Sequence, residues 1–376
     1  MTKFDQPSLF AEEVAATAFD PRRLTQARLL AGRTKQDVAA SLGISGAALG
    51  QYEAGITTPR PDQLPKLAES LGVPLGFFTG GRPYAHLDAS AAHFRSLRST
   101  RVSQRAKAVT HVEMLWELAY ALENYVELPY PDLPFIGDEA NFPSPESAAR
   151  ELRRHWDIAD GPFRHLTRTM EQHGIIVSLT SIAGDEVARV DAFSTSHLPR
   201  PIIILTPDRA DDVYRSRFTA AHELGHLVLH HDVAAGDVEK EKEADRFAAE
   251  LLAPTEQIAK ELSTRVRLSG LDQVSRRWGV SQKALVYRSR ELGLVSDTSA
   301  RRAYQKLEQL RLGGILQNES IRRFPGETPI LLSSAFELAQ ESGLTIEKLA
   351  ARLHWTPSMV RSMLGQENTR PKLRLV

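Results

Sequence analysis

The feature that most constrains this chain is a short run near its middle in which two histidines lie four residues apart. His222, Glu223 and His226 form the pattern His-Glu-x-x-His, with apolar residues around them at helical spacing. On a helix both imidazoles project from one face toward one point, where they can share a Zn²⁺ ion. Glu223 lies on the flank of that face and can act as general base on a water held there. The run predicts a zinc site with hydrolytic chemistry; two histidines that only fill a core are the alternative.

An acidic run downstream supplies candidates for the third ligand. Glu241 and Asp245 are four residues apart on a predicted helix. Glu241 can complete the ligand set, and Asp245 can accept a hydrogen bond from the N–H of a ligating histidine. Glu243 is the alternative third ligand, because alternating glutamates leave the helical register open.

Further histidines follow the motif, but we do not expect them to bind metal. The longer metzincin motif needs a glycine where this chain has Val228, so His230 is not predicted as a third histidine ligand. We interpret His230 and His231 as a polar helix end, with contact to a substrate as the alternative. Candidates for stabilising an oxyanion are unranked: Tyr214, His231 and Tyr287.

The N-terminal region has the spacing of a helix-turn-helix. Ala39 permits close approach of two helices, Gly43 permits a left-handed turn residue, and Ser45 can cap the helix expected to enter the major groove. The same spacing recurs twice, at Ser275, Gly279 and Ser281 and at Ala350, His354 and Thr356.

The expected contacts with double-stranded DNA lie on both helices of this motif. Lys35 suits a phosphate, and Gln51 is the clearest candidate for reading a base edge. The remaining candidates are Gln36, Ser45, Gly46 and Ala47. Lys plus Arg equal Asp plus Glu at 47 each, so DNA contact must come from a local patch rather than from net charge. A domain that serves only dimerisation or protein docking is the alternative.

Residues 93–126 begin with a second basic patch and continue as a predicted long amphipathic helix. The patch runs from His93 to Arg101 and continues with Arg105 and Lys107. This patch could touch phosphates or single-stranded nucleic acid. The solvated start of a charged helix is an equally good interpretation.

Glycine- and proline-rich stretches divide the chain. The predicted domains are 1–80, which begins with a lead-in over 1–21, then 81–145, 146–262 and 263–376. Strand signals lie at 175–177, 187–193 and 202–205, and either of the last two is a candidate edge strand for binding a peptide. The tail after 263 is expected to be a helical cap on the preceding domain, with a second DNA reader as the alternative.

Two known families resemble these regions. Residues 22–78 are similar to the XRE, or phage-repressor-like, helix-turn-helix family, although Lys35 stands where that family usually has glutamine. The His-Glu-x-x-His run and the later Glu-Ala-Asp-Arg-Phe run, within 147–260, resemble the ImmA/IrrE zinc metallopeptidases. The resemblance implies a mainly α fold with a five-helix N-terminal domain, a small α+β zincin-like domain and a helical C-terminal tail.

The same resemblance implies a function. We expect a homodimeric DNA-binding transcriptional regulator whose peptidase domain hydrolyses peptide bonds in a repressor-type protein or in itself, in response to stress. The alternative is a non-proteolytic repressor or antitoxin-like regulator whose zincin domain is a sensor or scaffold. The chain has no cysteine, no apolar signal core and no membrane-spanning run, which indicates a cytoplasmic protein without a membrane partner.

Overall fold

The computed structural model describes residues 9–87, 93–94, 102–134, 144–179, 192–205, 212–230, 237–264, 267–315 and 324–366. The chain forms two compact units, each built from separate stretches of sequence. Unit 1 comprises Met1–Ala89, Arg101–Leu128 and Leu332–Val376, and unit 2 comprises Ser90–Thr100 and Pro129–Leu331. No helix of the described stretches combines the length and the apolar character that crossing a membrane requires.

Unit 1 begins with short helices. They are α1 (Leu9–Thr17), α2 (Pro21–Leu30), α3 (Lys35–Leu42), α4 (Gly46–Glu53), η1 (Pro61–Gln63), α5 (Leu64–Leu71) and η2 (Leu75–Phe78). The expected lead-in over 1–21 therefore contains a helix, and α1 packs on α5. Its far end is held in place because Phe19 forms a β-bridge with Thr79 and the Asp20 N–H donates to the Phe78 carbonyl oxygen at 2.8 Å.

Each predicted helix-turn-helix repeat has the expected backbone. The turn residues adopt the left-handed conformation, with φ of 68° at Gly43, 64° at Gly279 and 52° at His354. The side chains two residues later each accept a hydrogen bond from a backbone N–H of the next helix: Ser45 from Ala48, Ser281 from Ala284 and Thr356 from Met359. The sequence spacing thus identified three such turns.

Helix α6 (Val102–Leu122) is the central helix of unit 1. Glu117 on α6 accepts hydrogen bonds from Arg23 at 2.6 Å and from Arg82 at 3.1 Å, and all three side chains are nearly inaccessible to solvent. This buried network joins α6 to α2 of the N-terminal helices. Because both guanidinium groups pair with the Glu117 carboxylate, the charges can be buried.

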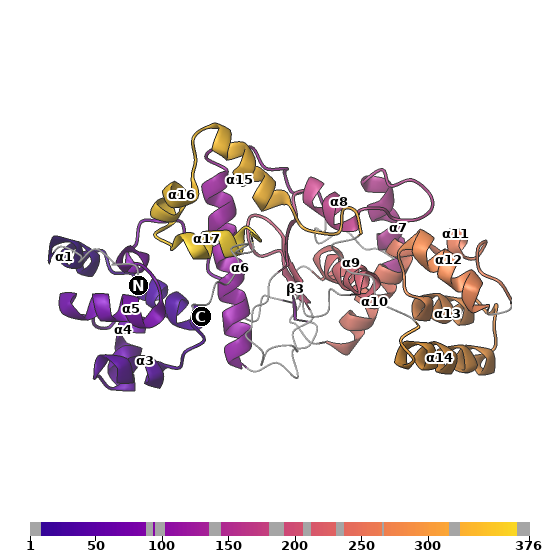
Figure 1. Cartoon of the computed structure of the whole chain (residues 1–376), viewed down its shortest axis with the longest axis horizontal. Helices are drawn as coiled ribbons and strands as arrows, with labels where there is room; N and C mark the ends of the chain where they lie inside the picture. Colours follow the sequence, from indigo (N-terminus) through magenta and orange to yellow (C-terminus); the bar gives the residue numbers. More distant parts are fainter. Residues whose placement is uncertain are drawn as a thin grey trace, which may run out of the picture. The chain divides into compact units, whose positions relative to one another are not determined.

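Unit 1 ends in further helices, two of which pack on α6. These are α15 (Leu331–Glu341), α16 (Ile346–Leu353) and α17 (Pro357–Met363), drawn in yellow shades in Figure 1. Helices α16 and α17 contact α6, and Arg82 donates to the Leu353 carbonyl oxygen. The region 263–376, expected as one domain, is therefore divided between the two units.

Unit 2 contains a small sheet. The described strands are β1 (His93–Phe94), β2 (Ile176–Leu179), β3 (Ala192–Thr195) and β4 (Ile202–Leu205), in the order β1-β3-β4-β2. Strands β2 and β4 are parallel, and β3 is antiparallel to β4 and β1. Residues 187–191 of one predicted strand lie outside the described part.

Within the described residues, neither candidate edge strand lies at the edge of the sheet. Both candidates, which correspond to β3 and β4, lie inside the described sheet, where β1 covers one and β2 the other. The start of the run interpreted as a basic patch supplies β1: His93 pairs with Ser194, and Phe94 pairs with Phe193. Residues 95–101 of that patch lie outside the described part.

Helices of unit 2 surround the sheet. They are α7 (Pro145–His155), α8 (Leu166–Gln172), α9 (Val213–Leu229), α10 (Val238–Leu252), α11 (Thr255–Ile258), α12 (Leu268–Trp278), α13 (Gln282–Glu291) and α14 (Asp297–Leu312). Helix α9 packs on β3 and β4 and lies beside α10 (Figure 1). One apolar core runs from α7 and the sheet through α9 and α10 to α14, so residues 267–315 pack against the rest of unit 2.

Candidate metal centre

Close packing of α9 against α10 brings the two predicted runs together. Asp212 caps α9 by accepting a hydrogen bond from the Tyr214 N–H at 3.1 Å, and Asp237 caps α10 by accepting one from the Glu239 N–H at 2.9 Å. Between the two histidines of α9, Gly225 has no side chain to hold α10 away. A Cβ there would lie 2.9 Å from Cδ1 of Phe247. The absent methyl group therefore permits the close approach of the helices.

Three predicted ligands form one cluster. The Nε2 atoms of His222 and His226 are 3.0 Å apart, and the Glu241 carboxylate lies 3.3 Å from the first and 3.5 Å from the second. In a tetrahedral zinc site with bonds of about 2.0–2.1 Å, ligand atoms lie roughly 3.3 Å from one another. The spacing and the chemistry of this donor set fit a zinc ion. Among the described residues, these three form the group that could hold a metal.

The ionisation state of the Glu241 carboxylate also suits a metal ligand. Burial would raise the pKa of Glu241, but hydrogen bonds with His222 and His226 outweigh it and hold the pKa at about 2. The carboxylate is therefore ionised near neutral pH, as a metal ligand has to be.

Hydrogen bonds on the far side of each histidine orient its ring. Nδ1 of His222 lies 2.8 Å from Oδ1 of Asp245, the residue predicted for this role. A carboxylate at Nδ1 favours the tautomer with the proton on Nδ1, which leaves the Nε2 lone pair for a metal.

His230 and Glu243 orient the ring of His226, and we did not predict this pair from the sequence. Its Nδ1 lies 2.9 Å from Nδ1 of His230, and Nε2 of His230 lies 2.8 Å from Glu243. Burial lowers the pKa of His230 to about 4, so its ring is neutral near pH 7. It then donates from Nε2 to Glu243 and accepts at Nδ1 from His226, which again leaves Nε2 of His226 for a metal.

Helix α9 does end at this point, with His230 as its C-cap residue, but the side chain of His230 is buried. The four-residue spacing of His230 from His226 could have indicated that the two rings are in contact. The partner of His230, Glu243, comes from another helix, so no sequence spacing indicated it. Glu243, the alternative third ligand, contacts His230 rather than the cluster. His231 lies outside the described residues.

Glu223 faces the sheet from the next position on α9. The residue is fully buried, and the hydroxyl of Ser194 on β3 donates to its Oε2 atom at 2.7 Å. Of the oxyanion candidates, Tyr214 packs against Phe324 and Tyr287 is 48% exposed on α13. Sequence reasoning did not identify Ser194, because the pairing of β3 with α9 brings together residues far apart in sequence.

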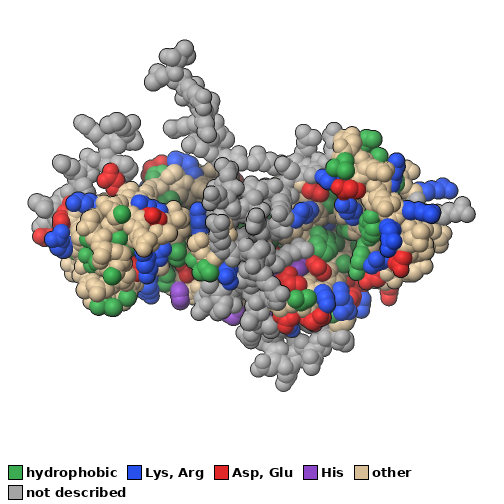
Figure 2. All heavy atoms as spheres, turned by 90° about the horizontal axis from the view of Figure 1, so that it is seen from below, with side chains coloured by type: hydrophobic (Ala, Val, Ile, Leu, Met, Phe, Trp, Pro, Cys, Tyr) green, Lys and Arg blue, Asp and Glu red, His purple; other side chains and the backbone are tan. Residues whose placement is uncertain are grey.

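The candidate DNA contacts lie on the surface of α3 and α4. Gln36, Ser45, Ala47 and Gln51 are exposed, and Gly46 is half-buried. Lys35 is exposed as well, but its ammonium lies 3.1 Å from Glu53, which also binds Arg28. Acidic and basic side chains are intermixed on the face of the molecule shown in Figure 2.

Comparisons with known proteins agree with both resemblances. Residues 24–78 match the helix-turn-helix family model, and residues 170–290 match the IrrE N-terminal-like domain, a peptidase family. No curated protein matches the chain. The second match runs past the predicted domain end at 262 and takes in α12 and most of α13. The chain thus carries a helix-turn-helix DNA-binding domain and an IrrE N-terminal-like domain.

Proposed function

We propose that this chain is a transcriptional regulator whose unit 2 is a zinc-dependent endopeptidase. The observation that carries the proposal is the arrangement of His222, His226 and Glu241, with Glu223 buried beside them. Zinc would be held by these two imidazoles and by the ionised carboxylate. When bound, zinc supplies a Lewis acid for the peptide carbonyl and for the attacking water.

The protein's own groups would move the protons. The Glu223 carboxylate takes a proton from water as that water attacks the peptide carbonyl carbon, and it delivers the proton to the leaving amine as the C–N bond breaks. The Ser194 hydroxyl holds one carboxylate oxygen at 2.7 Å and so orients the base. Asp245 and His230 keep the two imidazoles in the required tautomers.

The helix-turn-helix supports binding of a double-stranded operator, and two half-sites would call for a homodimer. The substrate would then be a regulator protein that meets the chain at DNA, or the chain itself, and stress would trigger the cleavage. A cytoplasmic location follows from this role.

The test compares Glu223→Gln with the control variant Glu239→Gln. Glu239 is an exposed glutamate on α10. Each full-length protein is loaded with zinc, its zinc content is measured, and it is incubated alone and with a mixture of denatured proteins. New N-termini are mapped by mass spectrometry. We expect cleavage by wild type and by Glu239→Gln but not by Glu223→Gln, with equal zinc content in all three.

The opposite outcome favours the second candidate function. If wild type with one zinc cleaves nothing, and Glu223→Gln still represses transcription as wild type does, unit 2 is a sensor or scaffold. The chain is then a non-proteolytic repressor or an antitoxin-like regulator rather than a peptidase.

A further inference from the structure

Helices α12, α13 and α14 of unit 2 repeat the local geometry of the N-terminal helix-turn-helix. Helix α13 packs on both α12 and α14, and the three helices lie side by side (Figure 1). The turn before α13 has Gly279 in the left-handed conformation, and the Ser281 hydroxyl accepts a hydrogen bond from the Ala284 N–H at 3.1 Å. Gly43 and Ser45 have the same roles before α4. Helix α13 is therefore the counterpart of α4, the helix expected in the major groove.

The shared register gives the exposed positions of α13 counterparts on α4. Counted from the two capping serines, Tyr287 corresponds to Gln51, the predicted base reader, and Lys283 corresponds to Ala47. Lys283, Tyr287 and Arg290 are exposed and lie four and three residues apart, which places them on one face of α13. All three side chains donate hydrogen bonds, and base edges and phosphates in the major groove offer acceptors. This face of α13 thus has the chemistry of a DNA-reading helix.

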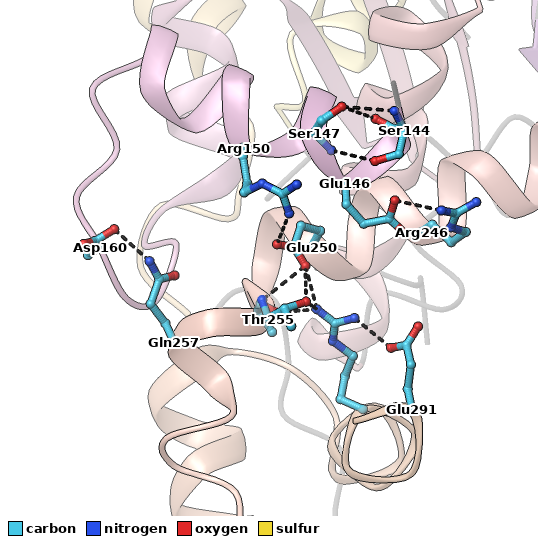
Figure 3. Close-up of polar contacts among 12 residues, drawn as sticks. Ser144, Glu146, Ser147, Arg150, Asp160, Arg246, Glu250, Thr255, Gln257 and Glu291 are labelled. Carbon is cyan, nitrogen blue, oxygen red and sulfur yellow. Dashed lines mark hydrogen bonds and ion pairs between the residues drawn. The ribbon is translucent and has the colours of Figure 1, made fainter. Parts of the chain in front are cut away.

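The opposite face of α13 holds the helix on the rest of unit 2. Arg288 is buried there, and its guanidinium donates to Glu250 of α10 at 2.8 Å and to Glu291 at 2.7 Å, within the network drawn in Figure 3. The turn is fixed as well, because Nε of Arg217 on α9 donates to the Gly279 carbonyl oxygen at 2.9 Å. These contacts determine which face of α13 is exposed.

The region around α13 is basic although the whole chain has no net charge. Residues 267–315 contain ten Lys or Arg and four Asp or Glu, which gives a net charge of +6. The N-terminal stretch 22–72 contains seven Lys or Arg and four Asp or Glu, which gives +3. A local excess of positive charge on a helix-turn-helix is what the phosphates of a duplex attract.

Three exposed cations of α14 have no carboxylate partner among the described residues. They are Arg301, Arg302 and Lys306. An open groove between α13 and α14 is lined by Lys283 and Gln305, among others. Arg301 lies one turn before Gln305 on the same side of α14, so it adjoins this groove. These free cations can bind phosphates beside a duplex that α13 enters.

Acidic side chains of α14 hold the two cations on the exposed face of α13. Lys283 lies 3.2 Å from Glu308, and Arg290 lies 3.8 Å from Asp297. Both ion pairs are partly exposed to solvent, where such pairs contribute little to stability. A DNA phosphate or base edge can therefore take the place of either carboxylate.

We propose that α12, α13 and α14 bind double-stranded DNA as a second helix-turn-helix. Helix α13 lies in the major groove with Lys283 and Tyr287 at base edges, and Arg301, Arg302 and Lys306 of α14 bind phosphates. This site adds a DNA contact of unit 2 to the one expected for the N-terminal domain. It does not depend on the proposed peptidase activity.

The first test removes the free cations of α14 from the full-length protein. A duplex of random sequence and about 30 base pairs is titrated by fluorescence anisotropy between about 50 and 200 mM salt. The triple variant Arg301→Gln, Arg302→Gln, Lys306→Gln should bind about tenfold or more weakly at the lowest salt. The slope of log K against log salt should become smaller by about 2–3, because each phosphate contact contributes about 0.9.

A matched control removes the same charge from other parts of unit 2. It replaces three exposed cations outside α12, α13 and α14, and these substitutions are Arg164→Gln, Arg168→Gln and Lys260→Gln. We expect the affinity and the salt slope of wild type. If both triple variants bind like wild type, or if both lose affinity equally, the proposal is wrong.

A gain of binding provides a test that a loss of folding cannot imitate. Glu308→Gln removes the carboxylate that holds Lys283, so it frees one cation and removes one negative charge. It should strengthen duplex binding roughly threefold or more at low salt. Glu256→Gln removes an exposed carboxylate of α11 and should leave binding unchanged. Equal affinities of these two variants would contradict the proposed face of α13.

Crosslinking then locates the DNA on the chain. Ultraviolet light joins a bromouracil-substituted duplex to the full-length protein, and mass spectrometry maps the joined peptides. We expect crosslinks in α13 as well as in α4. Crosslinks in α4 alone overturn the second site and leave the N-terminal DNA contact intact, whereas crosslinks in α13 alone support it and overturn that contact. If a single strand displaces the duplex from α13 more readily than a second duplex does, the site binds single strands and the helix-turn-helix proposal is wrong.

Discussion

Replacement of Gly225 by alanine tests whether close packing of α9 on α10 builds the metal cluster. The new Cβ would lie 2.9 Å from Cδ1 of Phe247 and 3.3 Å from the Ala244 Cα. Carbon atoms pack best at about 3.5–4.0 Å. Helix α10 would therefore have to move away by several tenths of an ångström, and Glu241 would move with it.

Two opposing effects set the size of the change in stability. Alanine favours the helix over glycine by about 1 kcal/mol. Forcing a methyl group into a filled core costs about 1–3 kcal/mol. Gly270 on α12 provides the matched control, since a Cβ there meets nothing within 4 Å and brings the helical gain alone. The free energy of unfolding of Gly225→Ala should therefore fall about 1–3 kcal/mol below that of Gly270→Ala.

Calorimetric melting and zinc competition provide the readouts. A difference of 1–3 kcal/mol corresponds to roughly 2–12 °C in the melting temperature of a unit of this size. Displacement of α10 should also weaken zinc binding in Gly225→Ala, measured against a chelator, and leave it unchanged in Gly270→Ala. If both variants gain stability equally and bind zinc like wild type, the helices are not held at close contact and this reasoning fails.

Three further changes test other parts of the molecule. Replacing His230 by phenylalanine removes the acceptor for Nδ1 of His226 and should weaken zinc affinity about 10–100-fold in a chelator competition; unchanged affinity would show that the ring needs no such partner. Glu327→Ala leaves the buried guanidinium of Arg217 without its carboxylate and should lower the free energy of unfolding in urea by about 3–5 kcal/mol, whereas a loss below 1 kcal/mol would contradict a buried ion pair. Burial raises the pKa of Glu171 to about 7, so its contribution to stability is complete below pH 4.5 and is lost as the pH rises toward 7. Glu171→Gln does not titrate there, so its stability relative to wild type should rise between pH 5 and 8, and parallel curves would refute the shift.

Local sequence patterns predicted the local parts of this structure well. Gly43 and Ser45 identified a turn and a cap within one short segment, and His222 and His226 identified one face of one helix. Each of these inferences depends only on helical geometry. They needed no knowledge of what packs against the segment.

Features formed between distant segments could not be predicted in this way. The choice between Glu241 and Glu243 depends on how α10 is rotated against α9, and the sequence leaves that register open. Two residues of strand β1 are described, and their pairing with β3 joins positions about a hundred residues apart. The partner of His230 and the contact of Ser194 with Glu223 likewise exist only after the chain has folded.

The way unit 1 is built has a consequence for any cut in the chain. Its three stretches are joined covalently through unit 2, so helices α16 and α17 reach α6 only after the chain has passed through the whole of unit 2. An intact chain keeps them at a high effective concentration near α6. One cut within 129–331 breaks the covalent part of that tether, and α16 and α17 are then held to α6 by noncovalent contacts alone, among them the hydrogen bond from Arg82 to Leu353. After such a cut, the DNA-binding unit keeps α16 and α17 only while the two fragments remain associated, and dilution favours their dissociation.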